Sequence, residues 1–300
     1  MPASSATRAK PARTYPEAAA LDAAFLRRKP QTTGPNGTQD RWFRSDWPPR
    51  LAILAGGLAT RLRPLTAATP KSLIRVAGEP FLAHQLRRLR CQGLREIVLC
   101  CGHLGDQIQA FAGDGARFGL SIACAHDGDQ PLGTGGALRA ALPLLGRRFL
   151  VTYGDSWLTE PLQPVWNAFL GCGKPALMTV FHNRNRWAAS NVQFHNGTIL
   201  RYDKLHPSPA MHHIDYGLEA MDASVLEHWI RPVFDLSEIW SALADYSLFA
   251  GYETAERFHE IGSLTGLRET ESAIAASGAL APVAPRLARP ASPRPREVLL

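Results

Sequence analysis

The chain has 300 residues, of which 45% are hydrophobic and 20% charged, as expected for a protein with a folded hydrophobic core. Its net charge of +7 suggests a polyanionic partner, but the excess positive charge lies in the two ends of the chain. Residues 1–50 contain nine basic and four acidic residues, and residues 275–300 contain four basic and one acidic. Residues 51–274 therefore carry a net charge of −1. No run of 18 apolar residues is present, which excludes a membrane-spanning helix and gives no reason to expect a membrane partner.

The two ends of the chain are rich in proline and lack a sustained apolar period. We therefore expect residues 1–48 and 275–300 to be disordered basic tails, and residues 49–274 to form the folded domain. No apolar leader segment opens the chain, and Glu17 and Asp22 are unfavourable in a transit peptide, so we expect a cytoplasmic protein. Five cysteines without a C-x-x-C pair fit reduced thiols better than a disulfide framework or a zinc site.

Short apolar runs alternate with helical periodicity between residues 50 and 155. The predicted strands are 51–55, 95–101, 120–125 and 148–153, and the predicted helices are 80–92, 104–111 and 134–142. This alternation predicts right-handed crossovers and an α/β fold with a doubly wound, mostly parallel, Rossmann-like sheet. In such sheets ligands bind beyond the carboxyl ends of the strands.

The second half of the domain has a mixed pattern and contains no glycine-rich phosphate loop. Asn196-Gly197 between two short apolar runs is a strong signal for a type I′ hairpin. The predicted strands are 175–182, 191–195, 198–202, 214–221 and 257–261, and the predicted helices are 161–170, 223–230 and 236–246. We expect this small mixed β/α portion to complete the same domain and to form the acceptor side of a cleft.

The segment LAGGLATRLRPLT (54–66), followed by TPKS (69–72), carries most of the chemical information. Gly56 and Gly57 come directly after a predicted strand and allow backbone amides to approach a polyphosphate closely. Arg61 supplies a planar multi-donor cation, and Lys71 a point charge that suits a phosphoryl group. The segment is neither the Rossmann G-x-G-x-x-G nor the P-loop motif.

This segment resembles the opening motif G-G-x-G-T-R-L-x-P-L-T…P-K of the sugar-1-phosphate nucleotidyltransferases. Four later segments resemble, in the same order, that family's nucleobase loop, its aspartate strand end, its sugar-phosphate lysine segment and its late carboxylate element. They are PLGTGGAL (131–138), YGD (153–155), RYDK (201–204) and HEIGS (259–263). The resemblance covers residues 50–272, and five ordered motifs are far more specific than any one of them.

The resemblance implies a GT-A-like nucleotidyltransferase fold without a carboxyl-terminal β-helix, since no six-residue repeat follows residue 272. Residues 49–155 would bind an NTP and residues 156–274 a sugar phosphate. The implied catalytic residues are Arg61 and Lys71, and the implied nucleotide contacts are Leu54, Ala55, Gly56, Gly57, Gly133 and Thr134. The implied sugar-phosphate contacts are Lys204, Asn191, Asp215 and Gly217, and the implied metal ligands are Asp155 and Glu260.

These residues fit the chemistry of nucleotidyl transfer, in which an acceptor phosphate oxygen attacks the α-phosphorus of an NTP. Asp155 and Glu260 would hold Mg²⁺ between the two anionic substrates. Lys71 would neutralise the α-phosphoryl group, Arg61 would hold the β- and γ-phosphates, and Lys204 the acceptor phosphate. No general base is needed, because a phosphate dianion is already a nucleophile. Gly135 and Gly136 would leave room for the nucleotide ring or ribose.

The sequence departs from the family's usual wording at three positions. Ala59 replaces a loop glycine, Ser72 stands where proline is frequent, and Glu260 replaces the commoner aspartate. None of these changes removes a charged group. Ordinary surface pairing offers a competing interpretation of two residues, since Glu260 could pair with Arg257 and Lys204 with Asp203.

The sequences of these motifs are most similar to those of the branch that contains D-glycero-D-manno-heptose 1-phosphate guanylyltransferases. This similarity implies GTP and a heptose 1-phosphate as substrates, with UTP and N-acetylmuramate 1-phosphate or a hexose 1-phosphate as the alternative. A catalytically silent nucleotide-binding regulator is a second hypothesis, based on Ala59 and Glu260. Nucleic-acid binding through the basic tails is the least favoured, because arginines among prolines with few aromatic residues are typical of a solvated tail. We expect a monomer or a small homo-oligomer.

Overall fold

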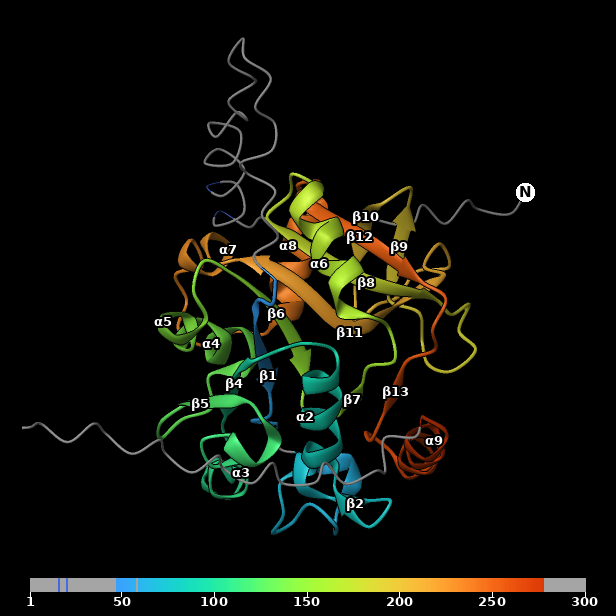
Figure 1. The fold of residues 1–300 in the computed structure, drawn as a ribbon. Helices are drawn as coiled ribbons and strands as arrows, with labels where there is room; N and C mark the ends of the chain where they lie inside the picture. Colours follow the sequence, from blue (N-terminus) through green and yellow to red (C-terminus); the bar gives the residue numbers. More distant parts are fainter. Residues whose placement is uncertain (1–15, 17–19, 21–46, 58, 278–300) are drawn as a thin grey trace, which may run out of the picture.

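A computed structural model describes residues 16, 20, 47–57 and 59–277 (Figure 1). The predicted tails, 1–48 and 275–300, lie almost entirely outside the described residues. None of the helices in this part of the chain combines the length and the apolar character that a membrane span requires.

The first half alternates strands with helices, as the sequence predicts. Its long strands are β1 (Arg50–Leu54), β4 (Glu96–Cys101), β5 (Ser121–His126) and β6 (Arg148–Tyr153). Its helices are α2 (Phe81–Cys91), α3 (Gly105–Ala112), α4 (Gly133–Ala140) and α5 (Leu142–Leu145). Short elements that the sequence did not predict are η2 (Thr60–Leu62), η3 (Lys71–Leu73), β2 (Arg75–Val76), β3 (Glu79–Pro80) and η4 (Ala116–Phe118).

The second half contains the predicted hairpin and three elements that the sequence did not predict. Asn196 and Gly197 have φ values of 45° and 76°, as a type I′ turn requires. The strands are β7 (Ser156–Trp157), β8 (Ala176–His182), β9 (Val192–His195), β10 (Thr198–Tyr202), β11 (His213–Asp222), β12 (Phe249–Thr254) and β13 (His259–Glu260). The helices are α6 (Leu162–Gly171), α7 (Ser224–Glu227), α8 (Leu236–Asp245) and α9 (Leu264–Ala276).

The unpredicted elements are β12, α9 and the two-residue strand β7. A glycine interrupts the apolar run of β12, and the structure explains it, because a Cβ at Gly251 would lie 2.5 Å from the Phe194 ring. Helix α9 has a glycine in its first turn, which weakens the helical signal, but the Ser263 side chain caps it by accepting the Gly266 amide at 3.0 Å.

Nine strands form one sheet in the order β5-β4-β1-β6-β11-β8-β12-β10-β9. Strands β5, β4, β1 and β6 are parallel, as predicted. Strand β11 runs antiparallel to β6 and β8, and β10 runs antiparallel to β12 and β9. The mixed pairing of the second half agrees with its predicted mixed pattern, but both halves share one sheet, so the prediction that the sheet as a whole is mostly parallel is wrong. The two-residue turn at Asn196-Gly197 permits only antiparallel pairing, and only β8 and β12 are parallel neighbours there.

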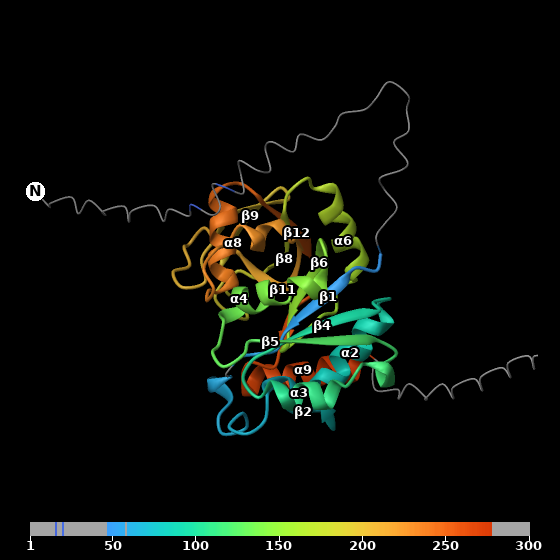
Figure 2. The ribbon, with the colours of Figure 1, turned by 90° about the vertical axis from the view of Figure 1, so that its left-hand side faces the viewer.

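Helices cover both faces of the sheet, which is the doubly wound arrangement (Figure 2). Alternate residues of β1 point to opposite faces. Ala52 and Leu54 belong to the core that the sheet forms with α4 and α8. Leu51 and Ile53 belong to the core that it forms with α2, α3 and α6. This two-sided burial fixes the carboxyl end of β1, where the predicted phosphate loop begins.

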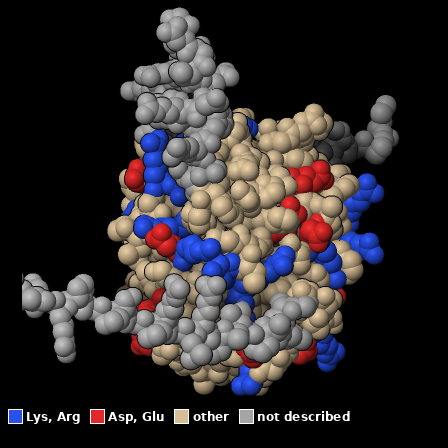
Figure 3. Space-filling view, viewed as in Figure 1, with Lys and Arg blue, Asp and Glu red and all other residues tan. Residues whose placement is uncertain are grey.

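Charged side chains of both signs are interspersed over the face of the molecule shown in Figure 3, outside the grey atoms. This mixture agrees with the net charge of −1 that the sequence assigns to residues 51–274.

Strand β11 carries a fully buried carboxyl group. The Glu219 side chain is 0% exposed, and its burial, together with the neighbouring Asp215 carboxyl, raises its pKa well above the ordinary range. Burial also raises the pKa of Asp215, and the charges of these two acids add to the burial that raises the pKa of Tyr153 and Tyr202. Burial thus favours the neutral form of the Glu219 carboxyl group.

We expect this buried acid to make stability fall as the pH rises. A raised native pKa contributes stability that is complete below the unfolded-state pKa of glutamate and is lost as the pH rises through the native pKa. Over that window, urea unfolding of wild type should lose about 1.4 kcal/mol per pH unit relative to Glu219→Gln. The exposed Glu227→Gln variant should follow wild type, and parallel profiles for wild type and Glu219→Gln would contradict the assignment.

Candidate active site

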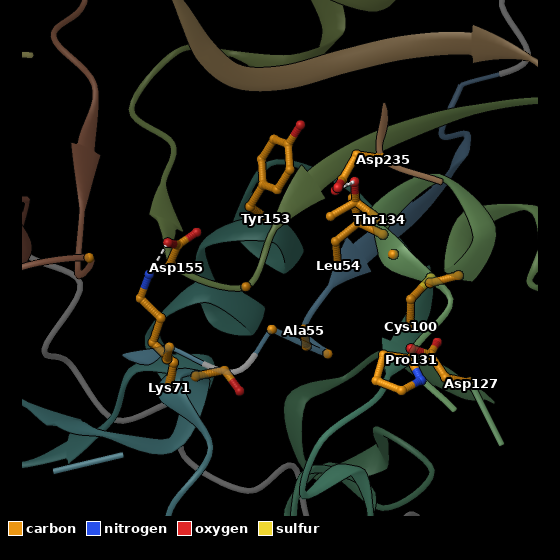
Figure 4. A pocket seen from close by; sticks show the side chains of 18 of the residues that line it. Leu54, Ala55, Lys71, Cys100, Asp127, Pro131, Thr134, Tyr153, Asp155 and Asp235 are labelled. Carbon is orange, nitrogen blue, oxygen red and sulfur yellow. Dashed lines mark hydrogen bonds and ion pairs between the residues drawn. The ribbon is translucent and has the colours of Figure 1, made fainter. Parts of the chain in front are cut away.

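A cavity of about 430 Å³ opens at the carboxyl ends of the parallel strands β1, β4, β5 and β6 (Figure 4). Leu54, Ala55, Gly56 and Gly57 line it from the end of β1, and Asp155 lines it from the end of β6. The other predicted residues in its wall are Arg61, Lys71, Gly133 and Thr134. All of the predicted nucleotide contacts and both predicted catalytic residues therefore share one cavity, at the place that the strand–helix alternation predicts.

Residues from three distant segments meet at the charged end of the cavity, where Lys71 and Asp155 line the wall and Glu260 lies behind Asp155 without lining it. Lys71 begins the short helix η3, and its ammonium group forms an ion pair with the Asp155 carboxylate (Figure 4). Glu260 lies on β13, which pairs with β7 so that Glu260 is opposite Ser156. The Ile261 amide also donates to the Asp155 carbonyl at 3.0 Å. The two predicted metal ligands therefore lie side by side, although 105 positions separate them in sequence.

The charges at this end of the cavity lie close enough to affect the pKa of Glu260. Burial raises the pKa of Glu260, and the Asp155 carboxylate raises it further. The positive charges of Lys71, Arg61 and Lys204 oppose this effect. Arg257, the predicted competitor for Glu260, instead forms an ion pair with Glu269 and stacks over the Trp187 ring at 3.5 Å. Two close carboxylates with a cation already on one of them form a donor set that fits Mg²⁺.

A small hydrophobic cluster lies beside Asp155 and Glu260 and holds their strands in place. Ile261 follows Glu260 and is fully buried with Trp157, which follows Ser156 on the partner strand. Ile274 of α9 closes the same cluster. Helix α9, which the sequence did not predict, thus stabilises the strand that carries Glu260.

The glycines of the phosphate loop have different roles. A Cβ at Gly56 would lie 2.7 Å from the Gly102 amide nitrogen, so this glycine is required by the close packing of the β1 and β4 ends. A Cβ at Gly57 would meet nothing within 4 Å, so Gly57 leaves open space in the cavity. Ala59 has a φ of 46°, a left-handed conformation that costs an alanine about 1 kcal/mol. The family's usual glycine at this position would carry no such cost.

The loop at the opposite end of the cavity differs in detail from the prediction. Gly133 has a φ of 73°, and Thr134 donates from its hydroxyl to Asp235 at 2.9 Å while accepting the Leu236 amide. A Cβ at Gly135 would lie 2.1 Å from the Phe234 ring, and one at Gly136 would lie 2.5 Å from the Pro232 carbonyl oxygen. The expectation that these two glycines make room for a nucleotide ring is therefore wrong. They make room for residues 232–234 of the chain itself.

The predicted sugar-side residues form a hydrogen-bonded group of their own. The Asp215 amide donates to the Asn191 side chain at 3.1 Å, and the Gly217 amide donates to the Asp215 carboxylate at 2.9 Å. Lys204 is exposed, and burial raises the pKa of both Asp215 and Glu260, an effect that the charge of Lys204 opposes. Asp203, its predicted competitor, accepts the amides of Leu205 and His206. Among the described residues, none of the four predicted sugar contacts lines the 430 Å³ cavity.

Several cavity residues escaped the sequence prediction. Asp127 directly follows β5, so the rule that placed Asp155 beyond β6 could have found it. Asp235 begins α8 in a capping box with Glu238, which is a recognisable helix start but gives no sign of a cavity. The others are Ala59, Leu62, Ser72, Cys100, Pro131, Ala137, Tyr153, Gly154 and Gly262.

Comparison with known sequences agrees with this geometry. Residues 51–189 match the family described as nucleotidyl transferase. An N-acetylmuramate alpha-1-phosphate uridylyltransferase of Neisseria meningitidis serogroup B is 46% identical over 104 residues, covering 34% of this chain and 45% of that protein. A mannose-1-phosphate guanylyltransferase catalytic subunit beta of Drosophila pseudoobscura pseudoobscura is 27% identical over 248 residues, covering 79% of this chain and 64% of that protein. The chain thus spans less than two thirds of the length of both relatives.

Solved structures show the same fold. A putative glucose-1-phosphate thymidylyltransferase from Bacillus anthracis, in complex with a sucrose, superposes with a TM-score of 0.67 at 20% identity, over 75% of this chain and 94% of that one. HddC from Yersinia pseudotuberculosis, complexed with GMP-PN, superposes with a TM-score of 0.64 at 21% identity, over 75% of this chain and 98% of that one. Residues 51–189 thus match the nucleotidyl transferase family, and the chain is similar in sequence to proteins named as sugar-1-phosphate nucleotidyltransferases.

Proposed function

We propose that this chain transfers a nucleoside monophosphate from an NTP to a sugar 1-phosphate, giving an NDP-sugar and pyrophosphate. The observation that carries the proposal is the polarity of the cavity. Lys71 and Asp155 lie toward one end, and Pro131 and Thr134 lie at the other (Figure 4). A nucleotide with its phosphates at the first end and its base at the second would match both ends.

The reaction needs one P–O bond to form and another to break at the α-phosphorus. An oxygen of the acceptor phosphate attacks this phosphorus, and pyrophosphate leaves on the opposite side. Lys71 stabilises the charge on the α-phosphoryl oxygens, and Arg61 holds the departing phosphates. Lys204 holds the acceptor phosphate. The acceptor is already anionic, so the chain provides orientation and positive charge and no general base.

Asp155 and Glu260 are the residues that would hold Mg²⁺. The bound ion would neutralise phosphate charge and bring the two anionic substrates together. In the structure Lys71 provides the positive charge beside Asp155. We infer that Lys71 exchanges this carboxylate for a phosphate oxygen when the substrates and the ion bind.

Asp127 supports GTP as the nucleotide. Its carboxylate lines the base end of the cavity, and one oxygen, Oδ2, accepts the Leu132 amide at 3.3 Å. Within 47–57 and 59–277, the structure shows no hydrogen bond to the other oxygen, which could accept a donor from a ligand. Guanine presents two adjacent N–H donors to a single carboxylate, whereas the corresponding edge of uracil presents one donor between two carbonyl oxygens. A carboxylate at this position therefore favours guanine.

The acceptor that we propose is a heptose 1-phosphate, on the basis of the motif wording. The alternative is a UTP-dependent reaction with N-acetylmuramate 1-phosphate or a hexose 1-phosphate, and the name of the Neisseria relative supports it. The free state of the five cysteines fits the proposed cytoplasmic location of this reaction. A monomer or small homo-oligomer also stays a proposal.

The reaction is tested by measuring pyrophosphate release from a panel of NTPs with heptose, N-acetylmuramate and hexose 1-phosphates. Release should require both substrates.

Lys71→Met and Asp155→Asn should each lower kcat/KM by about 100-fold or more, because each removes a preorganised charge at the reacting phosphate. Arg61→Met should also lower it, and the exposed Arg63→Met is the matched control. No release with any pair would refute the proposal, and NTP binding without turnover would support a silent regulator.

Base choice is tested separately with Asp127→Asn. Loss of the carboxylate should reduce the ratio of kcat/KM for GTP to that for UTP by roughly tenfold or more, as a hydrogen bond to a charged group contributes about 1.5–3 kcal/mol. Asp129→Asn changes an exposed carboxylate on the same loop and should leave the ratio unchanged. An unchanged ratio in Asp127→Asn would exclude this carboxylate as the base reader.

A further inference from the structure

Two histidines and a glutamate converge on three neighbouring strands of the second half. His182 ends β8, His213 begins β11, and Glu253 lies near the end of β12. Strand β8 lies between the other two, and His213 pairs with His182 in the register of the sheet. Their candidate ligand atoms all lie within 4.8 Å of one another. Among the described residues, none of the three lines the 430 Å³ cavity.

The contacts within this group are specific. The His182 and His213 rings stack at 17° with their centroids 4.8 Å apart. His213 Nε2 lies 3.0 Å from Glu253 Oε1, and the Phe194 ring meets His213 edge-on at 5.1 Å. The His213 side chain is only 12% exposed, while that of Glu253 is 47% exposed. The sheet and Phe194 thus hold one imidazole rigidly, and the carboxylate beside it can move.

We propose that His182, His213 and Glu253 bind a divalent transition-metal ion of the zinc class, at a site separate from Asp155 and Glu260. Two imidazoles and one carboxylate are the donor set that Zn²⁺ and Co²⁺ favour, whereas Mg²⁺ prefers oxygen ligands throughout. The exposed side of the group leaves a fourth position to water. The proposal is independent of the proposed reaction.

The site needs only small side-chain movements to close around an ion. Bonds of about 2.0–2.2 Å place tetrahedral ligand atoms roughly 3.4 Å apart, so the widest separation of 4.8 Å must shorten. The exposed Glu253 and His182 side chains can make this change by rotation. One competitor must leave, because Arg184 Nε donates to His182 Nε2 at 3.1 Å and occupies the lone pair that a metal would use.

The consequence of occupation is a cross-link between β11, β8 and β12. These strands carry the sugar side of the domain, and His213 lies two positions from Asp215 on β11. A bound ion would therefore stabilise this half of the sheet, and the gain would appear as a rise in the unfolding temperature with metal concentration.

The site is tested by equilibrium dialysis of the full chain against Zn²⁺, with excess Mg²⁺ present to occupy the carboxylate pair. One ion should bind per chain, and Co²⁺ should give the visible absorption of a tetrahedral site with nitrogen ligands. His182→Ala and Glu253→Ala should each weaken binding at least about tenfold, and both change exposed residues, so the fold should persist. Arg184→Ala should tighten binding, because it removes the competing donor.

His195→Ala is the matched control, since it changes an exposed histidine on the neighbouring strand β9. It should bind Zn²⁺ as wild type does and show the same rise in unfolding temperature. The proposal is overturned if wild type binds no Zn²⁺, if His182→Ala or Glu253→Ala binds as wild type does, or if Arg184→Ala fails to tighten binding.

Discussion

Two carboxylates that repel each other are held together at the edge of the sheet, and the candidate active site depends on this constraint. Asp155 ends a long parallel strand, and Glu260 reaches it only because β13 pairs with the short strand β7. Burial and this proximity raise the pKa of Glu260, so the arrangement is costly without a nearby positive charge. The packing of Ile261 against Trp157 stabilises it. Two carboxylates held close together in spite of their repulsion are suited to a site where a cation and phosphates bind.

The cations of the site follow from the same constraint. Lys71 lies on Asp155, and Arg61 and Lys204 act electrostatically on Glu260. They come from the phosphate loop, η3 and the segment after β10, so the first and second halves of the domain both contribute. In the proposed reaction, a substrate phosphate would take the place of Asp155 beside Lys71. The basic character of the whole chain plays no part in this, because residues 51–274 are close to neutral.

The sequence predicts most of the first half and less of the second, for physical reasons. Apolar runs buried on both faces identify parallel strands, and the rule that ligands lie beyond their carboxyl ends places Asp155 and the Gly56 loop correctly. Strand β12 and helix α9 were missed because tertiary contacts, at Gly251 with Phe194 and at Ile274 with Ile261, stabilise segments with weak local signals. The tight packing of Gly135 and Gly136 on residues 232–234 could not be predicted, because no local pattern reports a contact a hundred positions away.

The most direct test of this account is whether Asp155 and Glu260 hold one divalent ion together. Mn²⁺ can replace Mg²⁺ in such a titration, and electron paramagnetic resonance reports the free ion in the presence of a non-hydrolysable NTP. The account predicts that Asp155→Asn and Glu260→Gln each weaken Mn²⁺ binding at least about tenfold, while the exposed Glu256→Gln does not. Mn²⁺ affinity that is unchanged in both Asp155→Asn and Glu260→Gln would contradict it.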